Sequence, residues 1–176
     1  MNRSKLVFLS IALTLATSLT ANAQALNSDE KNTLATIAAI DKAEILVSVV
    51  AENKKVDSDV TDYAKMMVSQ HGNNLTQILN MDSQSKAGAL SSSQADQITQ
   101  QSKQDLMKLG ALQGKDFSIA YANAMVKGHE GALKLINDKL MKTAQSDEMK
   151  NFLTSTRSVV EQHLEHAKKL QSQLLS

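Results

Sequence analysis

The sequence contains no cysteine, so disulfide bonds are excluded, and so is a lipid anchor attached to a lipobox cysteine. Proline is also absent and glycine is scarce, with 6 residues among 176. Proteins built from many strands need such turn residues about every ten positions. The scarcity of both residues therefore predicts an all-α fold.

Aromatic residues make up only 3% of the chain, and the charges nearly balance, with 19 Lys and Arg against 18 Asp and Glu. Proteins that bind nucleic acids normally carry a basic patch, and those that bind single strands add aromatic side chains on which bases stack. Both features are missing from this sequence. We therefore expect no nucleic-acid partner.

A long apolar run occurs only near the start of the chain. Residues 2–5 form a short basic start, residues 6–19 are uncharged and mostly apolar, and residues 21–23 read Ala-Asn-Ala, a pattern that signal peptidase recognises. The run is too short for a membrane span, which needs roughly 20 apolar residues. We expect residues 1–23 to be a cleaved signal peptide and residues 24–176 to form one periplasmic domain without a transmembrane segment.

Apolar residues recur at helical spacing through most of the mature chain. A polar segment beginning near residue 82 interrupts this pattern and precedes a shorter amphipathic stretch. A long connection normally carries structure of its own, and in a four-helix bundle it lets the second and third helices run parallel. The prediction is a ferritin-like up-down-down-up four-helix bundle with a long crossover that carries a short extra helix. The long helices are expected at 28–53, 58–81, 116–142 and 146–174, and the extra helix at 93–110.

One nine-residue pattern occurs twice, in the expected second and third long helices. Residues 63–71 read YAKMMVSQH and residues 121–129 read YANAMVKGH, which is Tyr-Ala-x-x-Met-Val-x-x-His in both cases. Duplication of a helical hairpin explains the repeat directly, whereas convergent patterning of two core helices would imitate part of it. In parallel helices the two copies would lie at similar depth. Each copy presents Tyr, Met and His on one face, because these residues are four apart.

Inward-facing His and acidic residues in the middle of a helical bundle are typical of a metal site. The helical periodicity places Asp41 and Glu44 on the inner stripe of the first helix. Counting ~1.5 Å per residue from the turns places Glu44, the repeat methionines and His163 in one layer, with the repeat histidines one turn away. Thioether and imidazole ligands favour copper, especially Cu(I), and a carboxylate ligand extends the choice to zinc, iron or manganese. The candidate metal ligands are Glu44, Met67, His71, Met125, His129 and His163.

A metal-free core would account for the same residues in another way. Methionine commonly fills irregular gaps in cores, and a buried histidine is stable when a Glu or Tyr partner satisfies it. Because buried imidazoles and carboxylates are costly unless they pair or bind an ion, a Glu–His–His hydrogen-bonded network is the competing interpretation. His163 and His166 also have a chelating His-x-x-His spacing. Since Lys168 and Lys169 follow, we expect His166 to be solvated on the flank of its helix.

The order of these features resembles a bacterial family. An inward Glu on the first helix, YAKMMVSQH, a long connection, DFSIAYANAMVKGHEGAL and a final HLEHAKKL are similar to domain of unknown function 4142 over nearly all of the mature chain. The resemblance implies a ferritin-like fold and points to the same six candidate ligands. Members are often labelled predicted outer membrane proteins, a label that this sequence supports only as far as export. No established activity comes with the family.

The sequence does not favour catalysis. Di-iron bundles carry a Glu three residues before each of two histidines, and here those positions hold Val68, Val126 and Val160. The glycine-rich turns that present nucleophiles or bind phosphate are missing as well. We therefore expect no enzyme and consider two functions. The first is an exported periplasmic bundle that binds a transition metal, with copper favoured over zinc or iron. The second is a non-catalytic envelope bundle that binds a partner protein and has a metal-free polar core.

Overall fold

The computed structural model describes residues 25–85 and 90–176, and the predicted signal peptide lies outside them. Within the described residues every regular element is a helix, which confirms the all-α prediction. None of these helices combines the length and the apolar character needed to cross a bilayer. The elements are α1 (Ser28–Glu52), α2 (Ser58–Ser85), α3 (Ser93–Ala111), α4 (Gly114–Leu135), the π-helical turn η1 (Ile136–Leu140), α5 (Met141–Thr143) and α6 (Asp147–Leu175).

Side-chain caps fix where three of the long helices begin. Asn27 accepts hydrogen bonds from the backbone N–H groups of Asp29 and Glu30, and the Glu30 carboxylate accepts one from the Asn27 N–H. This reciprocal pair satisfies N–H groups that the first turn of a helix leaves free. Ser92 caps α3 and Ser146 caps α6. Glu30 also accepts from the N–H and the hydroxyl of Ser146, so one carboxylate joins the starts of α1 and α6.

Several helix boundaries differ from the prediction. α2 continues to Ser85, because the polar residues after Met81 extend a solvent-facing helical end as readily as they form a turn. Ser92 rather than Ser93 caps α3. α4 begins earlier than predicted, at Gly114, whose φ of +52° is a conformation that glycine adopts without steric cost. The helix predicted over 116–142 is interrupted by η1, a π-helical turn.

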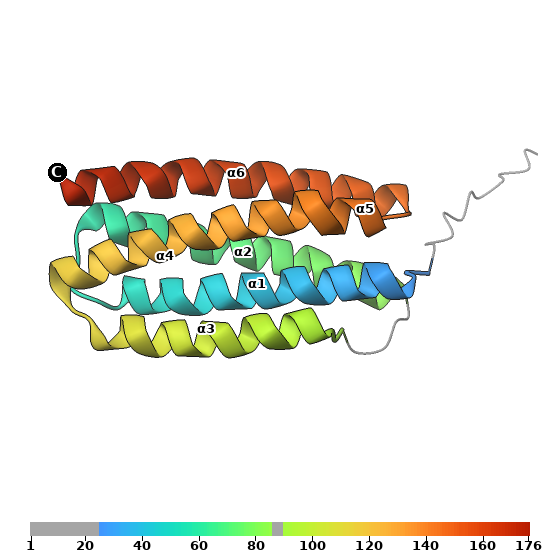
Figure 1. The fold of residues 1–176 in the computed structure, drawn as a ribbon, viewed down its shortest axis with the longest axis horizontal. Helices are drawn as coiled ribbons and strands as arrows, with labels where there is room; N and C mark the ends of the chain where they lie inside the picture. Colours follow the sequence, from blue (N-terminus) through green and yellow to red (C-terminus); the bar gives the residue numbers. More distant parts are fainter. Residues whose placement is uncertain (1–24, 86–89) are drawn as a thin grey trace, which may run out of the picture.

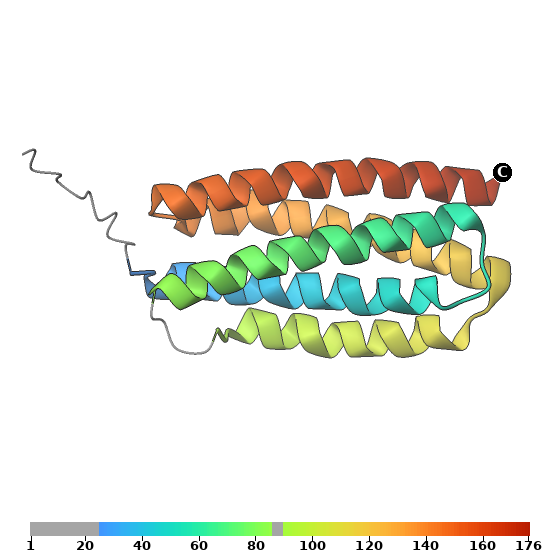
Figure 2. The same cartoon turned by 180° about the vertical axis from the view of Figure 1, so that it is seen from behind.

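The long helices follow the predicted up-down-down-up order. α2 and α4 run in one direction, while α1 and α6 run in the other (Figure 1). Figure 2 shows the same arrangement from behind, with α2 nearest to the viewer. α4, η1 and α5 form one continuous rod, and α3 lies along α1 as the helix of the crossover. The parallel course of α2 and α4 is the arrangement that brings the two repeated segments to similar depth.

The buried side chains form two apolar clusters separated by a polar layer. Along each of the four long rods, buried His or acidic residues occur between residues of the first cluster and residues of the second. Helical periodicity also predicts inward-facing positions for Ile45 of α1 and Leu75 of α2, and the structure buries both side chains only partly. The first cluster includes Leu34, Ile78, Ile136 and Leu153, and the second includes Ala51, Met67, Met125 and Ala167.

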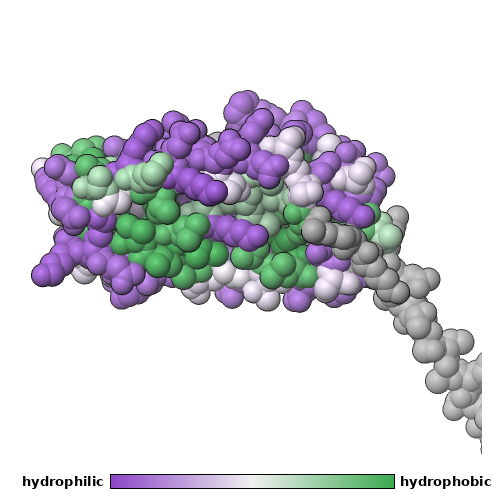
Figure 3. All heavy atoms as spheres, turned by 90° about the horizontal axis from the view of Figure 1, so that it is seen from below, coloured by the Kyte–Doolittle hydropathy of each residue, from purple (hydrophilic) through white to green (hydrophobic). Residues whose placement is uncertain are grey.

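Some large apolar side chains remain at the surface. Leu46 and Val49 of α1, Leu79 of α2 and Met107 of α3 are exposed. Figure 3 views the molecule from the side of α3 and shows apolar side chains reaching the surface in two areas with polar side chains between them. The outer surface of the bundle is therefore not uniformly polar.

Candidate metal centre

Three buried histidines, one each from α2, α4 and α6, meet in the polar layer. The ring centroid of His71 lies 5.8 Å from that of His129 and 5.1 Å from that of His163. The centroids of His129 and His163 are 5.3 Å apart. One ring nitrogen of each histidine lies within 4.8 Å of the other two. Three atoms this close all lie within about 2.8 Å of a common point, so small side-chain movements would give the ~2.0–2.1 Å of metal–imidazole bonds.

Each histidine has a hydrogen-bond acceptor at one ring nitrogen. His71 Nδ1 lies 2.8 Å from the Asp41 carboxylate, and His163 Nε2 lies 2.8 Å from Gln70 Oε1. His129 Nδ1 lies 2.7 Å from the backbone carbonyl oxygen four residues earlier. An oxygen acceptor requires the proton on this nitrogen, so in a neutral imidazole the second nitrogen carries a lone pair. Metal-bound histidines are usually held in this way.

The nitrogens that keep the lone pairs have no hydrogen-bond partner. Within residues 25–85 and 90–176, His71 Nε2, His129 Nε2 and His163 Nδ1 are buried and unpaired. An unpaired buried polar group costs about 1–3 kcal/mol, and such groups are rare in native proteins. In their neutral forms the rings cannot satisfy one another, because each donates its N–H to its oxygen acceptor. A metal ion would accept all three lone pairs.

Burial keeps two of these imidazoles neutral. Removal from water lowers the pKa of His129 to about 4 and that of His163 to about 3, and the neighbouring histidines act in the same direction. Neutral imidazole is the form that binds a metal ion. At pH 7 these two side chains can therefore bind an ion without first losing a proton.

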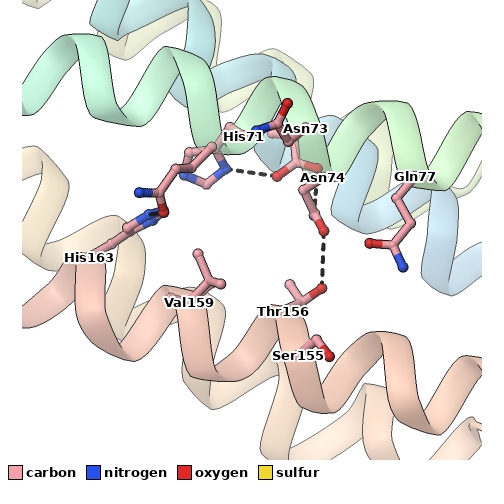
Figure 4. A pocket seen from close by; sticks show the side chains of 11 residues that line it. His71, Asn73, Asn74, Gln77, Ser155, Thr156, Val159 and His163 are labelled. Carbon is pink, nitrogen blue, oxygen red and sulfur yellow. Dashed lines mark hydrogen bonds and ion pairs between the residues drawn. The ribbon is translucent and has the colours of Figure 1, made fainter.

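A chain of hydrogen bonds fixes the position of Asp41. The Asn74 side-chain amide donates to Asp41 Oδ2 at 2.9 Å, and the Thr156 hydroxyl donates to Asn74 Oδ1 at 3.2 Å (Figure 4). Asp41 Oδ1 remains for the His71 N–H. The sequence placed Asp41 on the inner stripe but did not predict Gln70, Asn74 or Thr156 as partners. The spacing of Asn74, three residues after a predicted ligand, was the available indication.

Glu44 lies beside the histidine cluster, but it is not part of the group whose ligand atoms converge. In the part of the chain that the structure describes, its buried Oε2 has no hydrogen-bond partner. Its Oε1 lies against Gly128 of α4, where an added Cβ would stand only 2.9 Å away. Burial raises the pKa of Glu44 to about 7, although His71 acts to lower it. The role of Glu44 as a metal ligand stays a prediction.

The two repeated segments lie at the same depth, as predicted. The rings of Tyr63 and Tyr121 meet edge to face with centroids 6.2 Å apart, and the repeat histidines also meet. Met67 and Met125, which lie between Tyr and His in the repeat, are buried in the second apolar cluster with both tyrosines. The burial of these methionines is confirmed, whereas their role as metal ligands stays a prediction.

The residue count placed His163 about one turn too far from the repeat histidines. The structure groups it with His71 and His129 rather than in a separate layer. The count followed Cα positions, whereas long helical side chains lean toward the N-terminus of their own helix. Because α4 and α6 are antiparallel, the rings of His129 and His163 lean toward each other and meet. His166 is exposed on α6, as predicted.

An opening between α2 and α6, which we call the polar mouth, leads from the surface to the cluster (Figure 4). His71 and His163 line this cavity of about 260 Å³. Val159 points from α6 toward α2. The polar mouth therefore offers small ions a route with a largely polar lining to two of the three histidines. Its polar lining includes Gln70, Asn73, Asn74 and Gln77 of α2 and Ser155 and Thr156 of α6.

Comparison with known proteins gives one match. The family model described as Domain of unknown function (DUF4142) matches residues 15–170. No curated protein matches the chain, and no solved structure does. The matched range contains all six candidate ligands and the whole crossover helix, so the family model and the histidine cluster concern the same domain.

Proposed function

The chain belongs to the DUF4142 family, whose description names no activity, and we propose that it binds one transition-metal ion between His71, His129 and His163. One observation carries this proposal. One nitrogen of each of three buried rings lies within 4.8 Å of the other two, and one nitrogen of each ring lacks a hydrogen-bond partner within the described residues. Acceptors on the far nitrogens hold each ring in the orientation that a ligand needs.

A metal-free Glu–His–His network accounts for these contacts less well. Such a network needs hydrogen bonds from the carboxyl group to a ring or from ring to ring. Among the described residues, Glu44 Oε2 and one nitrogen of each histidine are unpaired instead. Four unpaired buried groups in one layer would destabilise an empty core by several kcal/mol in total, at about 1–3 kcal/mol for each group. Binding of an ion removes most of this cost.

Copper is the ion that we favour, with zinc as the alternative. Imidazoles suit both metals, and nearby thioethers from Met67 and Met125 would add preference for Cu(I). The buried charges also balance for either copper valence. A monovalent ion is neutralised by Asp41 when Glu44 is protonated, and a divalent ion is neutralised when both carboxylates are charged. The raised pKa of Glu44, about 7, makes both protonation states accessible near neutral pH.

The proposed setting is the periplasm, and the proposed role is to hold or buffer the ion rather than to catalyse a reaction. Support for export comes from the basic start, the apolar run and the Ala-Asn-Ala pattern of residues 1–23. Histidine ligands buried between helices suit retention of an ion, because exchange requires passage between α2 and α6.

Titration of the metal-free mature protein with Cu(I), Cu(II) and Zn(II), against a competing chromophoric chelator, tests the proposal. We expect one equivalent to bind, and the His71→Ala/His129→Ala variant to bind at least about 100-fold more weakly, since loss of a ligand outweighs loss of a supporting hydrogen bond. His166→Ala removes an exposed histidine from the same helix as His163 and should bind as the wild type does. Equal affinity in the double variant and the wild type would exclude the site.

The second candidate function is a bundle that binds a partner protein of the cell envelope. Apolar side chains that reach the surface favour it, because apolar surface patches are typical of interaction sites (Figure 3). This function predicts that the histidine substitutions change thermal stability without changing metal content. A saturable partner recovered from envelope extract by wild-type protein, together with an absence of bound metal, would support it over metal binding.

A further inference from the structure

A long groove separates α3 from α4, with α1 as its floor. Two adjoining cavities of about 470 Å³ and 390 Å³ make it up, and both are bordered by Glu44, Gly128 and Gly131. Its lining includes the apolar or small side chains of Val47 in α1, Leu106 and Leu109 in α3, and Ala120 and Ala124 in α4. Because of the groove, α3 packs along α1 and makes few contacts with α4.

α3 buries much less of its surface than the other long helices do. Within its described residues, 93–111, Leu109 is the only one that is buried. By contrast, buried residues recur along α1, α4 and α6. A segment with few buried apolar contacts opens at a lower free energy than the core of the same domain. The packing of α3 is therefore typical of a unit that opens separately from the rest.

The C-terminal end of α3 is held by a lysine from the link between α1 and α2. The Lys54 ammonium donates to the backbone carbonyl of Gly110 at 3.0 Å and to that of Leu112 at 2.6 Å. The last carbonyls of a helix lack partners within the helix, and positive charge is favourable there. Lys54 Nζ also lies 5.0 Å from the centroid of the Phe117 ring. These contacts with the carbonyls exist only while α3 is folded against the link.

The N-terminal end of α3 is held by a neutral contact. The hydroxyl of Thr36 in α1 lies 3.2 Å from that of Ser92, the residue that caps α3. A hydrogen bond from a charged donor is roughly twice as strong as a neutral one. We therefore expect Lys54 to be the stronger of the two attachments.

We propose that α3 is a strap that detaches from α1 as one unit while α1, α2, α4 and α6 stay folded. The groove makes this possible, because α3 can leave its place without breaking an extensive interface with α4. Gln101 and Asp105 of α3 line the same two cavities as Glu44. Detachment therefore exposes the side of the polar layer that faces away from the polar mouth.

The test is amide hydrogen exchange of the metal-free mature protein, resolved along the chain by NMR. We expect the amides of α3 to exchange together, and at least about 100-fold faster than those in the middle of the other long helices. The expectation concerns the fold alone. Failure of the metal site would therefore leave the strap testable, and failure of the strap would leave the metal site testable.

Two lysine variants test the C-terminal attachment. Lys54→Met keeps an apolar stem near Phe117 and removes the charged donor, so the amides of α3 should exchange about tenfold faster than in the wild type. The amides of α1, α2, α4 and α6 should not change. Lys55→Met is the matched control, because Lys55 is the next residue and is exposed, and it should leave the exchange of α3 unchanged.

A cross-link tests the N-terminal attachment. Thr36→Cys/Ser92→Cys places two thiols where the hydroxyls lie 3.2 Å apart, in a chain without another cysteine. The disulfide form should slow the exchange of α3 at least about tenfold relative to the reduced form of the same variant, because the link restricts the open state. Equal exchange of α3 and the other long helices in the wild type would overturn the proposal. Faster exchange of all helices alike in Lys54→Met, or insensitivity of α3 to both Lys54→Met and the disulfide, would overturn it as well.

Discussion

The polar layer of the bundle is adjacent to two openings of opposite character. The polar mouth between α2 and α6 is lined by amides and hydroxyls, whereas the groove between α3 and α4 is lined mostly by aliphatic and small side chains. On the side of the mouth, Asp41, Gln70 and Asn74 form hydrogen bonds that hold two of the three histidines. On the side of the groove, Glu44 has an unpaired oxygen in the described part of the chain.

The comparison shows that the polar layer is held by side-chain hydrogen bonds on the side of the mouth and lacks such bonds around Glu44 on the side of the groove, among the described residues. The hydrogen bonds near the mouth determine which ring nitrogens keep their lone pairs, so they prepare the histidines for an ion. On the side of the groove no comparable network surrounds Glu44 among the described residues, and its carboxylate lies directly against Gly128 of α4. The mouth therefore suits an ion, whereas the groove is lined mostly by apolar and small side chains.

The side of the mouth is tested most strongly by Asp41→Asn, which preserves the shape of the side chain and removes its charge. We expect metal affinity to fall about 10–100-fold, because an acceptor that holds a metal-bound histidine contributes this much. Competition titration with a chelator measures the change. The control is Asp138→Asn, which removes an exposed carboxylate that pairs with Lys134. Unchanged affinity in Asp41→Asn would mean that the network near the mouth does not support the ligands.

In the metal-free protein, the histidines and Glu44 are expected to change the free energy of unfolding in opposite directions when the pH is lowered. The pKa values of His129, about 4, and His163, about 3, lie below the 6.5 of histidine in the unfolded chain. Below pH 6.5 the unfolded chain therefore binds more protons than the folded chain, and the free energy of unfolding decreases as the pH is lowered. Glu44 acts in the opposite direction, because its pKa of about 7 exceeds its ordinary 4.5 and the folded chain takes up its proton first.

We therefore expect the free energy of unfolding to decrease from pH 6.5 to 4.5, since two histidines oppose one carboxyl group. Glu44→Gln removes the opposing group and should make the decrease steeper. Urea denaturation at a series of pH values measures both slopes. A shallower slope in Glu44→Gln than in the wild type would show that the carboxyl group does not titrate as its buried position implies.

The route of the ion is tested by narrowing each opening in turn. Val159→Phe places a larger side chain in the polar mouth and should slow metal association and dissociation several-fold, with equilibrium affinity unchanged, because the ligands are untouched. Ala124→Leu narrows the groove instead and should leave both rates unchanged. Stopped-flow measurement of metal binding distinguishes the two. If only Ala124→Leu slowed the exchange, ions would be entering through the groove.

The smallest expected effect concerns the glycines of the groove. Gly131→Ala should raise the free energy of unfolding by about 1 kcal/mol, the difference in helix propensity between the two residues. Gly128→Ala should gain less, because its Cβ would stand 2.9 Å from Glu44 Oε1 and displace the carboxylate. Thermal denaturation of both variants gives the comparison. A larger gain in Gly128→Ala would mean that the carboxylate has room that the structure does not show.

Composition and periodicity were sufficient to predict the arrangement of helices. The absence of proline and the 3.6-residue apolar spacing depend on local chemistry, and they predicted all five long helical segments and the parallel course of α2 and α4. Boundaries were less predictable. A polar stretch such as that before Ser85 fits a helical end or a turn equally well, and the φ of Gly114 depends on how the preceding loop meets α4.

The sequence identified which histidines form the cluster, but it predicted their relative positions less well. The repeat identified His71 and His129, and periodicity placed His163 on the inner face of its helix. Which residues share a level depends on the lean of side chains in antiparallel helices, which a count of Cα positions leaves out. The partners Gln70 and Thr156 depend on rotamers and on contacts across helices, so spacing alone could not identify them.

The most direct test of the account is a crystal structure of the copper-loaded mature protein with anomalous diffraction at the copper edge. The account predicts a single peak about 2.0–2.1 Å from His71 Nε2, His129 Nε2 and His163 Nδ1, with Asp41, Gln70 and the carbonyl oxygen of Met125 still bound to the opposite nitrogens. A structure without a peak between the three rings, or with copper at the surface near His166, would contradict it.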